Sequence, residues 1–457
     1  MQYGVDEGML YPLETLFSYM PSFSALIEED PSILASITAP DGHVYGFPNL
    51  AGATQRSYMM RFFVNTEWLG QLNLEAPTNL DELYEVLCAF RDNDMNGNGD
   101  TTDEIPMCVS WNGDYKLRAY ILNAFGFCTT NDNSALLYNA DGSAEAVYIP
   151  YTSLYKDYLA YMKKLWDANL LDPDMFTQDQ NQVNAKFTDN LSGYTSCAGL
   201  SAVSATLQYN WACAKPLVSE QNSLMISPKQ ASIATAGMFV INSNCEEEKA
   251  AAIANFVDSF FNPYTDILYK YGPTYSSEVI DGGEYGILSC DQHGQYFDAE
   301  TKKSVYVYDE SVYSSNWDYR TRLMSFWAYP GYSCNGNDKW YQLYAEKFPT
   351  TMIGMKWVAE QTGSVVSSDV MDASAVDNWI PYYTPMLPNF YYSTEDLATV
   401  NTLKVLLDDY VSNAEAKFIT GELSLDTDWD TFVSELEAYG VKEYNDLLVK
   451  YWTEYNK

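Results

Sequence analysis

Apolar residues recur every three or four positions in several stretches of this chain, a spacing that predicts amphipathic helices. Five stretches show it, and they cover residues 80–88, 154–166, 253–261, 403–418 and 429–436. Thr78 with Asp81 forms a predicted capping pair for the first helix, and Asp428 caps the last. The third helix should end at Asn262-Pro263, the fourth near Gly421 and the fifth at Gly440.

Short apolar runs between these helices predict strands. The runs are MMRFFVN (59–65), IPMCVS (105–110) and GMFVIN (237–242). Strands that alternate with helices favour an α/β architecture with mainly parallel sheets. Residues 280–350 are rich in Tyr, Gly, Asp and Asn with weak periodicity, so we expect an irregular insertion there.

One polar run, DNDMNGNGDTTDE (92–104), alternates oxygen-bearing side chains with glycines. Ca²⁺ takes six to eight oxygen ligands, and Gly lets a loop turn those oxygens inward. Two registers are possible. A loop that starts at Asp92 runs on to Asp100 and Asp103, whereas a loop that starts at Asp94 ends on Asp103 and Glu104. We prefer the second register because Glu104 adds a late carboxylate just before Ile105-Pro106.

The alternative for this run is a polar Asn-Gly turn that holds no ion. Without a cation, however, the turn would bring four carboxylates close together, which is electrostatically unfavourable. The predicted calcium site is structural, because it uses up oxygen ligands and brings no catalytic base.

Composition narrows the classes of function. The 457 residues are 47% hydrophobic, so the chain can bury large cores despite a net charge of −37. That charge argues against nucleic acid and anionic membrane surfaces as partners, and it suits an exported or salt-adapted soluble protein. No run of about 18 apolar residues predicts a membrane helix, and no signal peptide is visible.

The eight cysteines include no C-x-x-C pair, so zinc and thioredoxin-like sites are weakly supported. An even count permits disulfides, but a chain of this size does not need them, and we expect mostly buried thiols. The only histidines, His43 and His293, lie far apart in the sequence, which disfavours a His-based metal site or triad.

Aromatic residues are dense, with 39 Tyr, 20 Phe and 11 Trp, and their rings suit the apolar faces of sugars. Trp111 is the first candidate for sugar contact, because it follows a predicted strand and the ends of strands carry ligand sites in α/β folds. The other candidates lie near loops or glycines or just before the predicted strand 59–65, and they are Gln55, Arg56, Trp211, Trp327 and Trp357. For each of them, packing in the core or on the surface is the competing interpretation.

Enzyme motifs are scarce. No G-x-S-x-G elbow, P-loop or dinucleotide fingerprint occurs. Ser153 and Lys156 match S-x-x-K, but the companion motifs are missing. With 62 acidic residues, a glycosidase carboxylate pair cannot be recognised by spacing, so an exported carbohydrate-active enzyme stays the alternative to a binding protein.

Five segments in order resemble the extracellular solute-binding proteins of ABC transporters (family 1), in particular the carbohydrate-binding lipoproteins of Gram-positive gut bacteria. The segments are 64–90, 94–107, 165–177, 237–262 and 416–456, and residues 263–390 are the least diagnostic. The resemblance implies a binding protein and not an enzyme. It also implies a monomer that delivers a sugar or oligosaccharide to an ABC permease.

The resemblance further implies a type II two-lobed α/β fold with a hinge and a ligand cleft between the lobes. The lobes would divide as 1–57 and 237–315 for the first, and 58–236 and 316–457 for the second. A structural Ca²⁺ would be held by Asp94, Asn96, Asn98, the Asp100 carbonyl, Asp103 and Glu104, although the run has one residue more than the commonest pattern of relatives.

Residues 3–16 resemble sequence that follows the first strand–helix–strand unit of such proteins. We therefore expect a chain truncated at its N-terminus, and an extracellular lipoprotein in full-length form. A calcium-dependent adhesion module of dockerin type is a third alternative, but it needs two paired loops and only one is present.

Overall fold

The structure is a computed structural model that describes residues 2–51, 62–111, 117–196, 210–229, 233–261, 295–298, 303–306, 331–333, 374 and 377–456. The chain forms two compact units. Unit 1 comprises Met1–Ser57 and Gln230–Val366, and unit 2 comprises Tyr58–Lys229 and Ser367–Lys457. The lobe bounds expected from the sequence differ from these at the second and third crossings, and they stay predictions.

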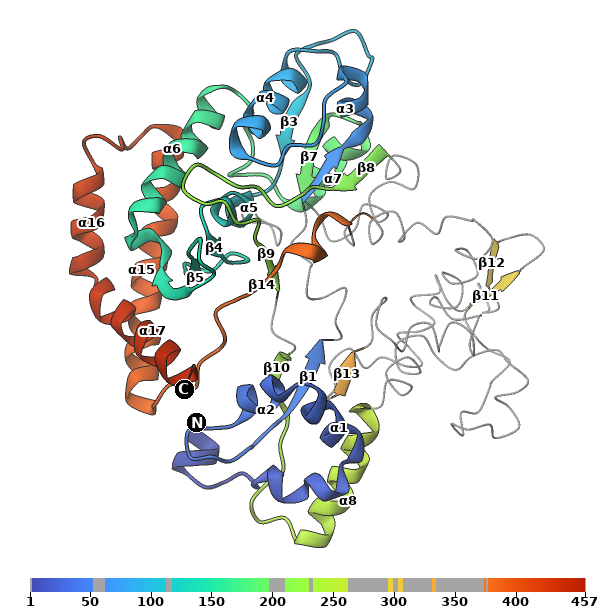
Figure 1. The fold of residues 1–457 in the computed structure, drawn as a ribbon, viewed down its shortest axis with the longest axis vertical. Helices are drawn as coiled ribbons and strands as arrows, with labels where there is room; N and C mark the ends of the chain where they lie inside the picture. Colours follow the sequence, from blue (N-terminus) through green and yellow to red (C-terminus); the bar gives the residue numbers. More distant parts are fainter. Residues whose placement is uncertain are drawn as a thin grey trace. The chain divides into compact units, whose positions relative to one another are not determined.

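Unit 1 is built on a three-stranded sheet (Figure 1). Its central strand is β1 (Phe47–Ala51), which runs antiparallel to β10 (Ile233–Phe239) and parallel to β13 (Gly331–Ser333). A separate antiparallel pair joins β11 (Gln295–Asp298) to β12 (Lys303–Tyr306). The helical segments of unit 1 are η1 (Gln2–Asp6), η2 (Leu13–Tyr19), α1 (Pro21–Glu29), α2 (Pro31–Ile37), α8 (Glu247–Asp258) and η6 (Ser259–Phe261).

The core of unit 1 joins residues from both of its segments. Phe23 on α1 packs against Phe47 and Phe261, with ring centroids 6.2 and 4.6 Å away. Asp258, at the end of α8, is only 5% exposed. Its carboxylate accepts hydrogen bonds from the backbone N–H groups of Ser22 (3.0 Å) and Phe23 (2.8 Å), which caps the first turn of α1.

Unit 2 contains a four-stranded sheet in the order β3-β7-β2-β8 (Figure 1). Strand β3 (Ile105–Cys108) is parallel to β7 (Ser192–Ser196), and β2 (Phe62–Asn65) is antiparallel to β7 and to β8 (Trp211–Cys213). The other strands of unit 2 are β4 (Phe127–Cys128), β5 (Ser134–Tyr138) and β6 (Ala144–Tyr148) in an antiparallel sheet, and β9 (Ser227–Lys229) parallel to β14 (Tyr383–Pro385).

Helical segments make up much of the described part of unit 2. They are α3 (Thr66–Leu72), α4 (Leu80–Arg91), α5 (Leu117–Ala124), η3 (Ile149–Tyr151), α6 (Ser153–Asp167), α7 (Gln180–Thr188), η7 (Ile380–Tyr382), α15 (Thr394–Thr420), α16 (Trp429–Ala438) and α17 (Val441–Tyr455). Among the described residues, no helix combines the length and the apolar content that crossing a bilayer requires.

A buried ion pair fixes α15 against α5 and α6. The Nε of Arg118 donates to both carboxylate oxygens of Glu415 at 2.9 Å, and the hydroxyl of Tyr158 donates to the same carboxylate at 2.8 Å. The side chains of Arg118 and Glu415 are only 6% and 4% exposed. The pair therefore depends on its partners for all of its stabilisation, because water does not reach it.

The predicted helices are confirmed in α4, α6, α8, α15 and α16, and Gly421 caps α15 in the left-handed conformation with a φ of 81°. The predicted cap of α4 is wrong by one residue. Asn79 is the N-cap and accepts from the N–H of Glu82, whose longer side chain reaches back to the N–H and hydroxyl of Thr78. An aspartate at position 81 is too short for that return contact.

Two further expectations are corrected. The sheets are mixed and rich in hairpins, not mainly parallel, because short loops join antiparallel neighbours such as β5 and β6. Strand β10 covers 233–239 and not 237–242. Gly237 adopts a φ of 70° within it, and beyond its end Asn242 forms only an isolated bridge with Leu10. The mixed α/β class is confirmed.

The thiols follow the sequence-based expectation where the structure describes them. Cys108, Cys128 and Cys213 are buried, and Cys88 and Cys245 are half-buried. All five are free of disulfides. The remaining cysteines, Cys197, Cys290 and Cys334, lie outside the described residues, as does His293.

Candidate functional site

The polar run forms the turn that joins α4 to β3, and Asp94 lies at its centre. The Asp94 carboxylate accepts hydrogen bonds from three backbone N–H groups, those of Gly97 (2.7 Å), Asn98 (3.1 Å) and Gly99 (2.9 Å). Gly97 and Gly99 have φ values of 75° and 90°, which residues with a Cβ rarely adopt. The glycines therefore let the chain wrap around one carboxylate.

Glu104 closes the turn from the far end and is only 8% exposed. Its Oε1 accepts from the N–H groups of Met95 (2.8 Å) and Asn96 (3.4 Å). Its Oε2 is buried and has no hydrogen-bond partner in the described part of the chain. Burial raises the pKa of Glu104, because a charged oxygen without a donor is poorly solvated.

Asp103 and Asp100 complete the acidic lining in different ways. The amide nitrogens of Asn98 (2.6 Å) and Asn96 (3.4 Å) donate to Asp103. The Asp100 carboxylate instead accepts from the hydroxyl (2.6 Å) and the N–H (2.9 Å) of Thr102, which lowers the pKa of Asp100. Because the Asp100 carboxylate is engaged with Thr102, the backbone carbonyl of Asp100 is the group available to bind a cation.

This donor set fits a hard cation. Its groups are carboxylates, a backbone carbonyl and Asn side-chain amides, and one buried carboxylate oxygen lacks a partner among the described residues. Within the described ranges, no three His, Cys, Asp or Glu side chains converge as a metal site on their own. The fit therefore depends on Asn side chains and on a backbone carbonyl as well as on carboxylates.

Trp111 lies just beyond the end of β3, as its place in the sequence predicted. Its backbone N–H donates to the backbone carbonyl of Met175 at 2.8 Å. Its half-buried ring lies 5.1 Å from Phe176, which in turn lies 5.6 Å from Trp166, measured between ring centroids. The indole is thus held from one side by an aromatic cluster, and it remains partly exposed.

Of the other five predicted ligand residues, the structure describes only Trp211. Trp211 is only 3% exposed in β8, where it packs against Phe187 at 4.9 Å. The remaining four, Gln55, Arg56, Trp327 and Trp357, lie outside the described residues. All six stay predictions, and Trp111 is the one with both a described environment and an accessible ring.

A buried polar cluster beside β3 was missed from the sequence. Asp172 is 0% exposed and accepts hydrogen bonds from Lys186, Gln178 and the Cys108 thiol. These residues come from β3, α7 and the segment between α6 and α7. No local spacing connects them, so only the fold brings them together.

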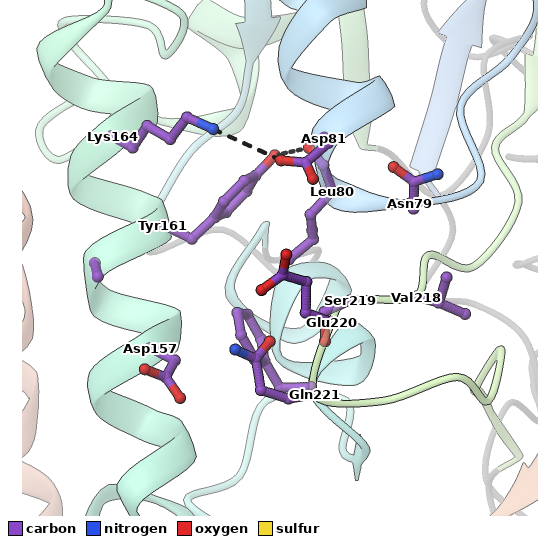
Figure 2. A pocket seen from close by; sticks show the side chains of 12 residues that line it. Asn79, Leu80, Asp81, Asp157, Tyr161, Lys164, Val218, Ser219, Glu220 and Gln221 are labelled. Atoms are coloured by element: carbon purple, nitrogen blue, oxygen red, sulfur yellow. Dashed lines mark hydrogen bonds and ion pairs between the residues drawn. The ribbon is translucent and has the colours of Figure 1, made fainter. Parts of the chain in front are cut away.

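Unit 2 also has a surface pocket of about 610 Å³, shown in Figure 2. It lies between the start of α4, one face of α6 and the loop 218–221, and its charged lining consists of Asp81, Asp157, Lys164 and Glu220. Lys164 lies 3.8 Å from Asp81, and the Tyr161 hydroxyl donates to the carbonyl of Leu80 at 2.7 Å. None of the predicted ligand residues lines this pocket.

No protein-family model matches the chain. One curated relative is the fructooligosaccharide ABC transporter substrate-binding protein FusA of Streptococcus pneumoniae. It is 25% identical over 463 residues, which cover 98% of this chain and 77% of FusA. A second is the lipoprotein LipO of Bacillus subtilis, 28% identical over 37% of this chain and 32% of its own length.

The predicted resemblance to ABC-transporter solute-binding proteins is confirmed. The fold agrees. The structure of FusA in complex with kestose matches with a TM-score of 0.66 and 23% identity, and covers 99% of this chain and 84% of FusA. A milk-oligosaccharide-binding solute-binding protein of Bifidobacterium longum infantis gives 0.70 at 18% identity, over 100% of this chain and 86% of that one.

Two expectations can be judged from these similarities. The two-lobed α/β fold class is confirmed, because the solved solute-binding proteins match nearly the whole chain. FusA is a substrate-binding protein of an ABC transporter, which favours a binding protein over the enzyme alternative. A further FusA structure is described as an EF-hand mutant, so that relative has an EF-hand.

Proposed function

We propose that this chain is the substrate-binding protein of an ABC importer and that it captures a short oligosaccharide. The observation that carries the proposal is the alignment with the fructooligosaccharide-binding FusA, which covers 98% of the chain. Fructooligosaccharides are therefore the first class of ligand to test. Release to a permease, a monomeric state and an extracellular lipid-anchored location belong to the same proposal.

The Trp111 ring supplies the apolar surface that such a ligand requires. The C–H face of a sugar ring packs against a flat aromatic face, while hydroxyls bind polar groups nearby. Phe176 packs on the Trp111 ring, and the Met175 carbonyl fixes the Trp111 backbone. A ring held in this way loses little freedom when it binds, which favours affinity.

Binding would shift the protein between two arrangements of its lobes and make no covalent bond. A ligand that contacts both lobes stabilises the closed arrangement by its differential affinity for that state. In this proposal, Trp111 is the contact that unit 2 contributes.

We propose calcium for the turn at 94–104. The residues that would hold it are Asp94, Asn96, Asn98, Asp103 and Glu104 through side chains and Asp100 through its carbonyl. The chemistry that Ca²⁺ supplies is charge neutralisation of the clustered carboxylates. To present an oxygen to the ion, the Asn96 and Asn98 amides, whose nitrogens now face Asp103, would turn and give up the hydrogen bonds that their oxygens accept from the N–H groups of Asn98 and Asp100.

A thermal-shift screen with a broad oligosaccharide panel tests the proposed function. The panel holds kestose, nystose, milk oligosaccharides and pectin fragments, with glycerol and a free amino acid as controls. We expect a raised melting temperature with at least one oligosaccharide and none with the controls. Silence across the panel from a protein with a cooperative melt would contradict the proposal, and turnover of labelled oligosaccharides would favour the enzyme alternative.

A further inference from the structure

A single buried carboxylate connects three parts of the structure around Trp111. Both oxygens of Asp172 accept from the Nζ of Lys186, at 2.9 and 2.8 Å. Asp172 also accepts from the amide of Gln178 (2.8 Å), the N–H of Asp174 (3.0 Å) and the thiol of Cys108 (3.1 Å). Burial opposes its ionisation, but these hydrogen bonds outweigh burial and keep the pKa of Asp172 below its usual value.

The same contacts fasten the segment 172–178 along the end of β3. The N–H of Asp172 donates to the carbonyl of Met107 at 3.0 Å. At the other end of the segment, the Gln178 amide donates to the carbonyl of Val109 at 2.6 Å, and the Ser110 hydroxyl donates to the carbonyl of Gln178 at 2.8 Å. The segment is therefore held at both ends, and Met175 and Phe176 in its middle contact Trp111.

Trp111 packs against the middle of this segment. The carbonyl of Met175 accepts a hydrogen bond from the backbone N–H of Trp111 at 2.8 Å, and the ring of Phe176 packs against the indole. Trp111 has no polar contact of its own to Asp172. An effect of the carboxylate on the indole passes through the segment that the carboxylate organises and through β3, whose Cys108 donates to Asp172.

We propose that Asp172, paired with Lys186, is a positioning residue that fixes the indole of Trp111 for sugar binding. This inference rests on the proposed function, because it gives Trp111 the stacking role. The physical reason is that the carboxylate is the acceptor shared by β3, α7 and the segment 172–178. Replacing Asp172 with asparagine keeps the size of the side chain but replaces one carboxylate oxygen with an NH2 group. That NH2 group would face the N–H and S–H donors that now bind the carboxylate.

Fluorine NMR of the protein labelled with 5-fluorotryptophan tests the inference without any ligand. The signals of Trp111 and Trp166 are assigned from W111F and W166F. In Asp172→Asn we expect these two signals to shift or broaden, while those of Trp429 and Trp452, in the C-terminal helices, stay in place. Asp258→Asn is the matched control, because it makes the same substitution at a buried carboxylate in unit 1.

Sugar affinity is the second measurement. We expect Asp172→Asn to weaken binding of the oligosaccharide identified in the screen by about tenfold, which corresponds to 1.4 kcal/mol. Lys186→Met should do the same, and Lys186→Arg, which keeps a cation, should restore most of the affinity. Because Lys186 is 22% exposed, its variants keep the test open if Asp172→Asn fails to fold.

Unchanged Trp111 signals in both Asp172→Asn and Lys186→Met would overturn the inference. Equal shifts in Asp258→Asn would also overturn it, because they would reflect general destabilisation. If the wild-type protein binds no oligosaccharide, the proposed function fails, whereas the NMR result still decides whether Asp172 positions the indole.

Discussion

Glu104 and Met95 are joined by a hydrogen bond of 2.8 Å from the backbone N–H to one carboxylate oxygen, while the second oxygen is buried with no partner among the described residues. A buried carboxylate oxygen without a donor destabilises the fold unless it is protonated or meets a cation. This relationship makes the turn at 94–104 the place where ion binding should have the largest effect on stability.

We predict that Ca²⁺ raises the melting temperature and that chelation lowers it. At a concentration 100 times the dissociation constant, the gain in unfolding free energy should be about 2.7 kcal/mol. Glu104→Gln should remove most of this gain. The matched control, Asp92→Asn, should not, because Asp92 pairs with Arg91 at the surface.

The two registers considered from the sequence give opposite results in this experiment. A calcium response lost in Asp92→Asn and kept in Glu104→Gln would favour the loop that starts at Asp92. If chelator does not change the melting temperature, the interpretation that remains for residues 94–104 is a polar turn that holds no ion.

The calcium response should also depend on pH, with a sign set by Glu104. Its pKa is raised from 4.5 in the fold, so without metal its contribution to stability is present below 4.5 and lost as the pH rises through the raised value. Calcium needs the ionised form and reverses this preference. The apparent calcium affinity should therefore fall as the pH drops toward the raised pKa, as calorimetric titrations at several pH values would reveal. An affinity that is constant with pH would show that Glu104 is not a ligand.

Breaking the buried pair of Arg118 and Glu415 should destabilise unit 2 severely. Glu415→Gln leaves a guanidinium without its countercharge, and such a change costs about 3–5 kcal/mol. The control is Asp167→Asn at the exposed pair with Lys163, which should cost only about 0.5 kcal/mol. Urea denaturation of both variants measures the difference. Similar losses in the two would mean that burial adds nothing to the Arg118 pair.

Gly46 permits a close approach of two backbone segments in unit 1. A Cβ added there would lie 2.5 Å from the Cα of Gly237, so one of the two segments must shift. Gly46→Ala should cost about 1–3 kcal/mol, as overpacking usually does. Gly70→Ala is the control, because nothing lies within 4 Å of its added Cβ in α3, and it should stabilise by about 0.5–1 kcal/mol. Thermal melts that rank the two variants in the reverse order would contradict this packing.

His43 should give unit 1 a small pH dependence. Its Nδ1 lies 2.6 Å from the Glu14 carboxylate, and this hydrogen bond raises the pKa of His43 above 6.5. The stability from the pair is thus present below 6.5 and lost as the pH rises through the raised value. His43→Gln should remove this part of the pH dependence in melts at pH about 5.5 and about 8. Identical profiles for the two proteins would show that the pair contributes nothing.

The helices were predictable because their apolar spacing is local information. The spacing did not show which face of each helix packs against the core. Phe256 in α8 is 62% exposed, whereas Ala250 and Ala254 are buried, because small residues let the helix pack closely on its neighbours. The cap of α4 was misplaced because Thr78-Asp81 and Asn79-Glu82 carry similar signals, and side-chain length decides between them.

The candidate site was predictable only where sequence neighbours form it. The turn at 94–104 and the place of Trp111 after β3 follow from contiguous residues. The cluster of Asp172, Lys186 and Cys108 joins positions up to 78 residues apart, and strand pairing brings them together. Among 62 acidic residues, the sequence alone does not distinguish a buried aspartate from an exposed one.

Isothermal titration calorimetry with oligosaccharides, on calcium-saturated wild-type protein and on Trp111→Ala, tests the central claim most directly. We predict saturable binding of at least one oligosaccharide with one site per chain, and a loss of about tenfold in the variant, because an aromatic contact is worth about 0.5–1.5 kcal/mol beyond its buried area and tenfold corresponds to about 1.4 kcal/mol. No binding heat with any oligosaccharide, from wild-type protein that melts cooperatively, would contradict the claim.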